Sequence, residues 1–173
     1  LRSEPGLDVT RAHHRPRRLA MALILPVGSL LLAGFDCPPR TRHVTFIDNG
    51  GYGDRIDTCT TARGQAGRLP DSWHGPFRAT DRRSQKPREI GAFERGKRSG
   101  PWARYGDNGA VILRRGYDQG QLDGTWASVY PNGAREELGR YDRGKKDGVW
   151  RRWFDNGRLA SEIAWSCGAK WGE

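Results

Sequence analysis

The chain has 173 residues and a formal charge of +10, with 35% hydrophobic residues, 24 glycines, seven tryptophans and five tyrosines. This length allows one ordinary domain or one short repeat array, and the aromatic content is too high for a disordered chain. From residue 91 onward, fifteen basic and eleven acidic side chains are interspersed. Such mixing is typical of a solvated sheet surface and not of the single-sign stripe that binds nucleic acid, so no nucleic-acid partner is predicted.

Residues 1–35 form the first predicted segment, in which a basic cluster precedes an apolar run from Leu19 to Phe35. This is the layout of a secretory signal peptide. The run contains Pro26 and Gly28 and is shorter than the ~20 residues of a membrane helix. Cleavage and export to the periplasm or cell envelope are predicted, with a retained anchor as the alternative. The sequence LLLAGFDC resembles a bacterial lipoprotein signal, but Phe35 occupies the position of the lipidated cysteine, which argues against a lipid anchor.

Residues 36–74 form a second segment, which contains Cys37 and Cys59. A disulfide between them would close a loop of about 23 residues and contribute on the order of 3 kcal/mol, which suits a segment with little apolar mass in an oxidising compartment. Zinc binding is not predicted, because Cys37, His43 and Cys59 have no paired short spacing and no fourth ligand. Cys167 is left over and is predicted to be exposed, either as a free thiol or in an intermolecular disulfide.

A repeat of 24 residues fills most of the remaining chain. Each copy begins with an aromatic residue, continues with two glycines and a tryptophan, and then reaches an Asn-Gly pair. The Trp column comprises Trp102, Trp126 and Trp150, and the Asn-Gly pairs are Asn108-Gly109, Asn132-Gly133 and Asn156-Gly157. Asn-Gly between β-formers indicates a hairpin with a type I′ turn. The Gly-x-x-x-Gly stretch, as in GKKDG, is predicted to be the loop that leads into the next hairpin.

The predicted repeat array spans residues 75–173. It comprises a degenerate first copy at 75–92, copies at 93–116, 117–140 and 141–164, and a partial copy at 165–173. A single hairpin is marginal in water, so the copies must stack to bury their aromatic residues. The predicted fold class is therefore all-β, an elongated antiparallel β-meander of hairpin repeats preceded by the N-terminal hydrophobic segment.

The pattern of Tyr, Gly, Gly-x-Trp and Asn-Gly at this period resembles the bacterial variant of the MORN repeat, some members of which are labelled antitoxin-like. The signal-like start, CPPRTRHV, Cys59 and HGPF resemble exported MORN proteins of myxobacteria and their relatives. The resemblance covers about residues 75–173. It implies a twisted antiparallel β-meander with no chemistry of its own, and roles in protein–protein scaffolding, attachment near membranes or phospholipid binding.

No catalytic, cofactor-binding or metal-binding residues are predicted, and the chain is not expected to be an enzyme. His43 and His74 lie in different segments, and no Ser occupies a nucleophile elbow. The Gly-containing loops are followed by neither Lys-Ser nor Lys-Thr, as a phosphate-binding loop requires. Asp123 and Asp147 stand before the second glycine of their copies and are interpreted as turn residues.

The function predicted first is that of a non-enzymatic exported scaffold that binds a protein or an envelope surface. The alternatives are an intracellular antitoxin-like protein that neutralises a partner toxin, and a binder of anionic lipid or glycan at a membrane surface. The Trp column either holds the repeats together or grips a ligand. Aromatic and arginine side chains suit interface anchors. The predicted interaction surface comprises Trp102, Trp126, Tyr130, Trp150 and Phe154, with Arg104, Arg151 and Arg152 nearby.

Overall fold

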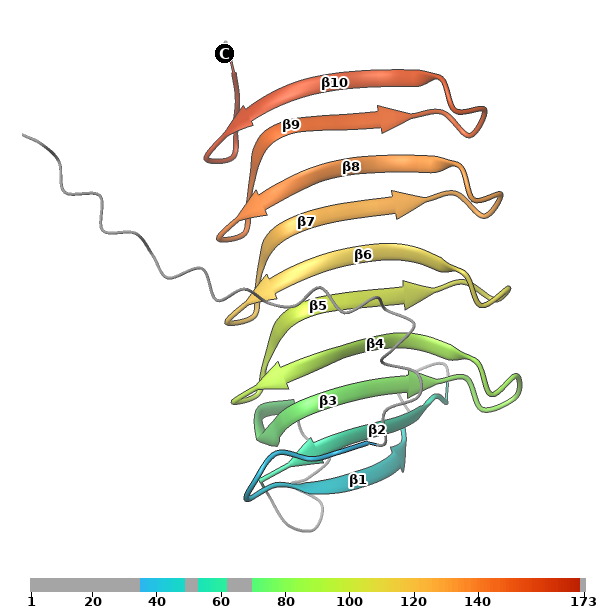
Figure 1. Cartoon of the computed structure of the whole chain (residues 1–173), viewed down its shortest axis with the longest axis vertical. Coiled ribbons are helices and arrows are strands. Elements are labelled where there is room, and N and C mark those ends of the chain that lie inside the picture. Colours follow the sequence, from blue (N-terminus) through green and yellow to red (C-terminus); the bar gives the residue numbers. More distant parts are fainter. Residues whose placement is uncertain (1–34, 49–52, 62–69, 172–173) are drawn as a thin grey trace, which may run out of the picture. The chain divides into compact units, whose positions relative to one another are not determined.

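The aromatic-rich segments of the sequence fold into strands that short turns connect, as a computed structural model shows (Figure 1). The structure describes residues 35–48, 53–61 and 70–171. The predicted signal segment, apart from Phe35, lies outside these ranges, as does Gly172. The strands belong to one compact unit, Gly34–Glu173, so the pre-repeat segment and the repeats share it.

Eleven strands of the described chain form one open antiparallel sheet in which each strand pairs with its neighbours in sequence. The predicted all-β meander is confirmed. It begins earlier than the repeat array, since the first two strands come from the pre-repeat segment. The strands are β1 (Arg42–Ile47), β2 (Arg55–Thr60), β3 (Trp73–Thr80), β4 (Pro87–Glu94), β5 (Lys97–Tyr105), β6 (Val111–Asp118), β7 (Gln121–Val129), β8 (Arg135–Asp142), β9 (Lys145–Trp153), β10 (Leu159–Ser166) and β11 (Ala169–Lys170), with a 3₁₀ turn η3 (Pro70–Ser72) before β3.

The Asn-Gly turns do not have the predicted type I′ geometry. In the β7–β8 turn, Gly133 has a φ of +84° whereas Asn132 is not in the positive-φ region. The N–H of Gly133 donates to the Tyr130 carbonyl, and the N–H of Tyr130 donates to the Ala134 carbonyl. This is the pattern of a three-residue type I turn closed by a left-handed glycine, and Pro131 favours it because proline suits the second position of a type I turn.

The type I′ turns lie at the other end of the hairpins, at the first glycine of each Gly-x-x-x-Gly stretch. Arg143 and Gly144, for example, have φ values of +46° and +81°. The second glycine of the stretch, such as Gly148 at φ +73°, lies inside a strand, where the pairing of β8 with β9 shifts register. The predicted loop is therefore a two-residue turn followed by a bulged strand. The four turns of this kind are Arg95-Gly96, Gln119-Gly120, Arg143-Gly144 and Cys167-Gly168.

Each type I′ turn is also tied to the preceding hairpin. The N–H of Gly144 donates to the Leu122 carbonyl in β7 at 2.7 Å. The N–H of Arg143 donates to Oδ1 of Asp123 at 3.2 Å. His74 takes the place of Asp123 two hairpins earlier in the array. Its Nδ1 accepts the N–H of Arg95 at 3.2 Å. In these two hairpins the residue before the second glycine thus stabilises the next turn along the array.

The hydrophobic core lies against β2–β5 and consists mainly of aromatic rings. Trp73 meets Phe93 edge-on with ring centroids 4.9 Å apart, and Phe77 lies 5.3 Å from Trp102. The predicted disulfide is confirmed: Cys37 and Cys59 are joined, with their Cα atoms 5.6 Å apart. It fastens the segment before β1 to β2 beside this core. Cys167 is exposed, as predicted, and its thiol is free.

Candidate functional site

One row of residues crosses the whole sheet and organises the candidate site. Strand pairing sets these residues side by side, so their side chains share one face of the sheet. We call this the central row. In strand order from β1 to β10 it comprises Phe46, Ile56, Ala79, Glu89, Arg104, Leu113, Ser128, Glu137, Arg152 and Ser161.

This face of the sheet is hollowed in two places. A hollow of about 1170 Å³ lies over β1–β6 and is lined by core aromatic residues together with charged side chains such as Arg88 and Glu89. A smaller groove of about 410 Å³ lies over β5–β9, and the central row from Arg104 to Arg152 lines it. Arg104 belongs to both. The hollowed face therefore offers apolar surface and exposed charge in the same place, a combination that suits ligand recognition.

Two tryptophans of the predicted interaction surface are buried. Trp102 is 1% exposed and Trp150 is 4% exposed. The ring of Trp102 covers Gly91 of the neighbouring strand and its Nε1 donates to the Ala92 carbonyl at 3.2 Å. Trp150 covers Gly139 in the same way and donates to the Arg140 carbonyl at 3.0 Å. These two rings bind adjacent hairpins together, and burial keeps them from reaching a partner.

Trp126 differs from the other two members of its column. It is half-buried, and its partner on the preceding strand is Arg115, where Trp102 and Trp150 each cover a glycine of their preceding strand. Its Nε1 is buried and meets no acceptor in the described part of the chain. The ring lies 5.7 Å from that of Tyr141 and lines the smaller groove. Of the three tryptophans, Trp126 is the one that contributes to the hollowed surface of the groove.

The remaining predicted surface residues are divided between the two faces and the hairpin ends. Arg104 and Arg152 are exposed on the hollowed face, and neither forms an ion pair with another described residue. Arg151 points to the opposite face, where its Nε lies 2.5 Å from Oε2 of Glu162. Tyr130 is half-buried and donates to the Trp153 carbonyl. Phe154 is 54% exposed at the end of β9.

A charged cluster that sequence reasoning missed, formed by Glu89, Arg98 and Arg115, lines the larger hollow. Each carboxylate oxygen of Glu89 accepts a hydrogen bond from a different arginine: Nη2 of Arg98 lies 3.2 Å from Oε2, and Nη2 of Arg115 donates to Oε1. Arg98 also donates to the hydroxyl of Tyr117 and lies 4.3 Å above the ring of Trp102. The three charged residues come from three consecutive strands, so no local sequence pattern reveals their contact. One carboxylate thus binds two guanidinium groups, and the cluster keeps a net positive charge.

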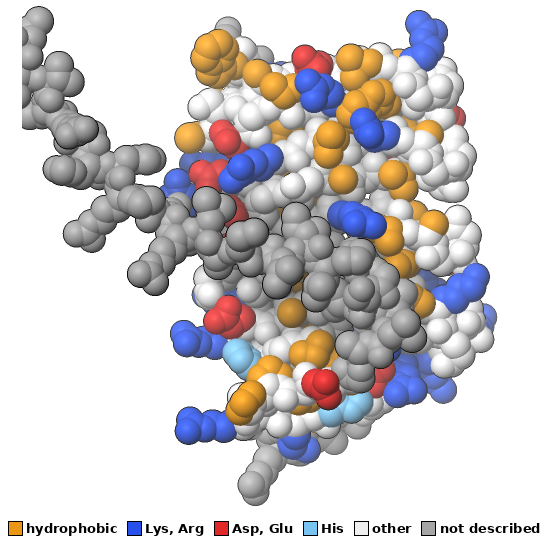
Figure 2. Space-filling view, in the orientation of Figure 1, with side chains coloured by type: hydrophobic (Ala, Val, Ile, Leu, Met, Phe, Trp, Pro, Cys, Tyr) orange, Lys and Arg blue, Asp and Glu red, His pale blue; other side chains and the backbone are white. Residues whose placement is uncertain are grey.

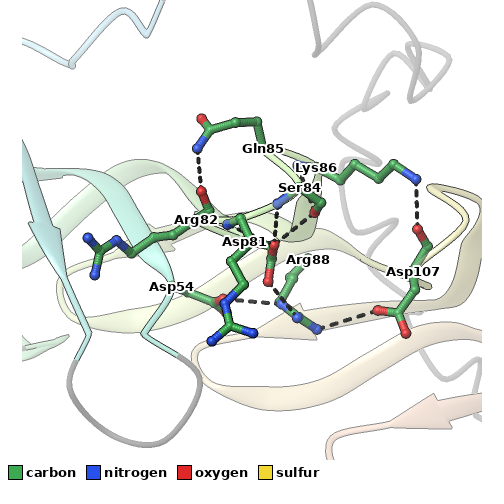
Figure 3. A network of polar contacts seen from close by, with 9 residues as sticks. Asp54, Asp81, Arg82, Ser84, Gln85, Lys86, Arg88 and Asp107 are labelled. Atoms are coloured by element: carbon green, nitrogen blue, oxygen red, sulfur yellow. Dashed lines mark hydrogen bonds and ion pairs between the residues drawn. The ribbon is translucent and has the colours of Figure 1, made fainter.

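Arg88 holds together three loops at one rim of the larger hollow (Figure 3). Its guanidinium lies 2.7 Å from Asp81, 3.1 Å from Asp54 and 3.7 Å from Asp107. The N–H of Ser84 and then Arg88 hold the pKa of Asp81 far below its usual range, and Asp81 in turn raises the pKa of Arg88. Burial raises the pKa of Asp54 although Arg88 opposes this. The network fixes the rim of the hollow.

The described residues contain no group of three or more His, Cys, Asp and Glu side chains that could hold a metal ion. Within the same ranges, no helix has both the length and the apolar character to cross a membrane. Basic and acidic side chains are mixed over the visible face, and hydrophobic side chains gather toward the β9–β10 end (Figure 2). Val149, Leu159 and Trp171 are among the exposed apolar residues there.

Comparison with known proteins finds no family model and no curated protein that matches the chain. The fold that the structure shows, a long antiparallel meander of short hairpins, is compatible with a MORN-like repeat fold.

Proposed function

We propose that this chain is an exported, non-enzymatic repeat protein of the MORN type that binds another protein through the hollowed face of its sheet. The observation that carries the proposal is the combination, on one face, of two hollows with the exposed and unpaired guanidinium groups of Arg104 and Arg152. Exposed arginines beside apolar surface are frequent anchors of protein interfaces.

Three features support export and a binding role. The start of the sequence has the layout of a signal peptide, as exported MORN proteins of myxobacteria do. The Cys37–Cys59 disulfide is compatible with an oxidising compartment. The buried tryptophans and the paired glutamates are explained by the stability of the array, which leaves the exposed arginines without a structural role.

Site-specific crosslinking tests the proposed face. A photoreactive amino acid is placed at position 104, on the hollowed face, or at position 114, which is exposed on the opposite face of the neighbouring strand. We expect a covalent adduct with an envelope protein at position 104 and none at position 114. Equal adducts at the two positions, or adducts at 114 alone, would refute binding through the hollowed face.

Fractionation tests export. The processed chain is expected in the periplasm or envelope, with Cys37 and Cys59 oxidised and the N-terminus shortened when its mass is measured. A cytoplasmic pool with reduced thiols would instead favour the antitoxin-like alternative. Pelleting of the purified chain with anionic liposomes across a salt series tests the lipid alternative, because electrostatic binding weakens as salt increases.

A further inference from the structure

The hairpins alternate between two kinds, so the structural unit of the array is 48 residues long rather than 24. In the first kind, Glu89 pairs with Arg98, whose guanidinium lies 4.3 Å above the ring of Trp102. Forty-eight residues later, Glu137 pairs with Lys146 at 3.4 Å, and the ammonium of Lys146 lies 3.7 Å above the ring of Trp150. Both tryptophans cover a glycine and donate to a carbonyl.

The hairpin between these two lacks the same groups. Leucines occupy the positions of the glutamate and of the cation, at Leu113 and Leu122, and Arg115 replaces the glycine beneath Trp126. The array therefore presents two such charged pairs, which we call stations, separated by an interval that has leucines at these two positions and Arg115 beneath Trp126. The smaller groove lies in that interval.

An unpaired arginine lies beside the glutamate of each station. Glu89 is the strand partner of Arg104, and Glu137 is the strand partner of Arg152. Because the glutamates are engaged by Arg98, Arg115 and Lys146, the two row arginines are left exposed. They are four strands apart, or about 19 Å at the usual strand spacing. Ser128, halfway along the row, leaves space above the sheet because its side chain is small.

We propose that the smaller groove binds an extended acidic segment of a partner protein, running along the central row across the strands. One carboxylate of the segment binds Arg104, a second binds Arg152, and an apolar side chain between them enters the groove over Leu113, Trp126 and Ser128. Six residue steps of an extended chain span about 20 Å, which matches the separation of the arginines. The proposal rests on the proposed binding function and names the chemistry of the partner.

Glu136 is the charge that opposes such a ligand. It lines the groove and forms no ion pair with another described residue, whereas Glu137 is compensated by Lys146. An acidic segment would therefore bind more tightly after Glu136→Gln. This gives a substitution that should raise affinity, beside those that should lower it.

Synthetic heptapeptides test the proposal with the purified full chain. The probes carry Glu at positions 1 and 7 and Leu, Phe or Trp at position 4, and the matched controls carry Lys at positions 1 and 7. We expect the Glu peptides to bind at least tenfold more tightly, measured by fluorescence polarisation. Arg104→Ala and Arg152→Ala should each weaken binding about tenfold, and Ser128→Trp should abolish it by filling the groove. Arg114→Ala, on the opposite face, should leave it unchanged.

Equal binding of the Glu and Lys peptides, unchanged binding by the Arg104→Ala/Arg152→Ala double variant, or no peptide binding at all would overturn the proposal. The double variant Arg104→Glu/Arg152→Glu should reverse the preference toward the Lys peptides, which loss of folding cannot mimic. If crosslinking at position 104 captures a partner but the acidic peptides fail, the inference about ligand chemistry falls and the proposed binding face stands. If both fail, the proposed face falls too.

Discussion

The three tryptophans of the repeat column are evenly spaced in the sequence but differ in burial. The residue opposite each ring on the preceding strand determines whether that ring is buried. Gly91 and Gly139 leave room for the rings of Trp102 and Trp150, whereas Arg115 occupies the corresponding place beneath Trp126. A Cβ added to Gly139 would lie 2.2 Å from the nearest ring atom of Trp150. Sequence alone predicted a ladder of rings but not which rings are buried, because the deciding glycine lies eleven residues away.

The substitution Gly139→Ala tests this dependence on space. We expect it to lower the free energy of unfolding by about 3 kcal/mol, near the top of the range for overpacking, because the neighbouring ring is held on several sides. The matched control is Gly144→Ala, where φ is +81° and no atom lies within 4 Å of the added carbon. Only backbone strain of about 1 kcal/mol applies there. Urea unfolding curves that give equal losses for the two variants would contradict this account.

At the scale of single elements, the sequence predicted the hairpins of the array but placed the type I′ turn at the wrong end of each hairpin. The rule that links Asn-Gly to type I′ turns assumes that asparagine adopts a positive φ. Here the side chain of Asn132 instead accepts the N–H of Ala134 at 2.9 Å, which favours the three-residue turn. The type I′ turns contain Arg, Gln or Cys before the glycine. These residues are not typical of type I′ turns, so the sequence did not indicate the turn type there. Hydrogen bonds to the preceding hairpin stabilise those turns.

The β3–β4 turn lacks the Asn-Gly pair of the later hairpins, and hydrogen bonds to Asp81 hold it together instead. Oδ1 of Asp81 accepts the N–H of Ser84 at 2.6 Å, while Oδ2 binds Arg88. Because the folded pKa of Asp81 lies below its ordinary value of 3.8, ionised Asp81 stabilises the fold above that pH, and this stabilisation is lost as the pH falls through the folded pKa.

Asp81→Ala should therefore destabilise the chain at pH 7, and the gap to the parent chain should narrow steadily below about pH 4. Urea midpoints of both chains at pH 7, 4 and 2 measure this gap. Asp81→Asn separates the two contacts, since it keeps a turn acceptor but loses the ion pair. A gap that stays constant across the three pH values would show that the charge of Asp81 is not what stabilises the turn.

At the scale of the whole sheet, the pre-repeat segment and the repeats are continuous. The repeat period cannot reveal this, because β1 and β2 carry none of the repeat residues. The same limit applies to the charged cluster on the hollowed face: Glu89 and Arg115 are 26 residues apart, and their contact follows from strand register rather than from spacing. What the sequence did predict, the meander and the Cys37–Cys59 bond, depends on patterns that are local or repeated.

Reduction of the disulfide should destabilise the chain by about 3 kcal/mol, since the bond joins residues 22 positions apart. Urea unfolding with and without dithiothreitol measures this. The double variant Cys37→Ser/Cys59→Ser should be destabilised already and should not respond to the reductant. Cys167→Ser should behave like the parent chain. A parent chain that unfolds at the same urea concentration in both conditions would contradict the expected role of the bond.

The alternation of hairpins constrains how such a chain can change length. Inserting one 24-residue copy would place two hairpins of the same kind next to each other, either two leucine hairpins or two glutamate hairpins. It would also move the later arginine of the central row, Arg152, two strands farther from Arg104. Adding or removing 48 residues would preserve the order, and the distance between recognition points would change only in steps of four strands. Length variants of this architecture are therefore expected to differ by even numbers of hairpins.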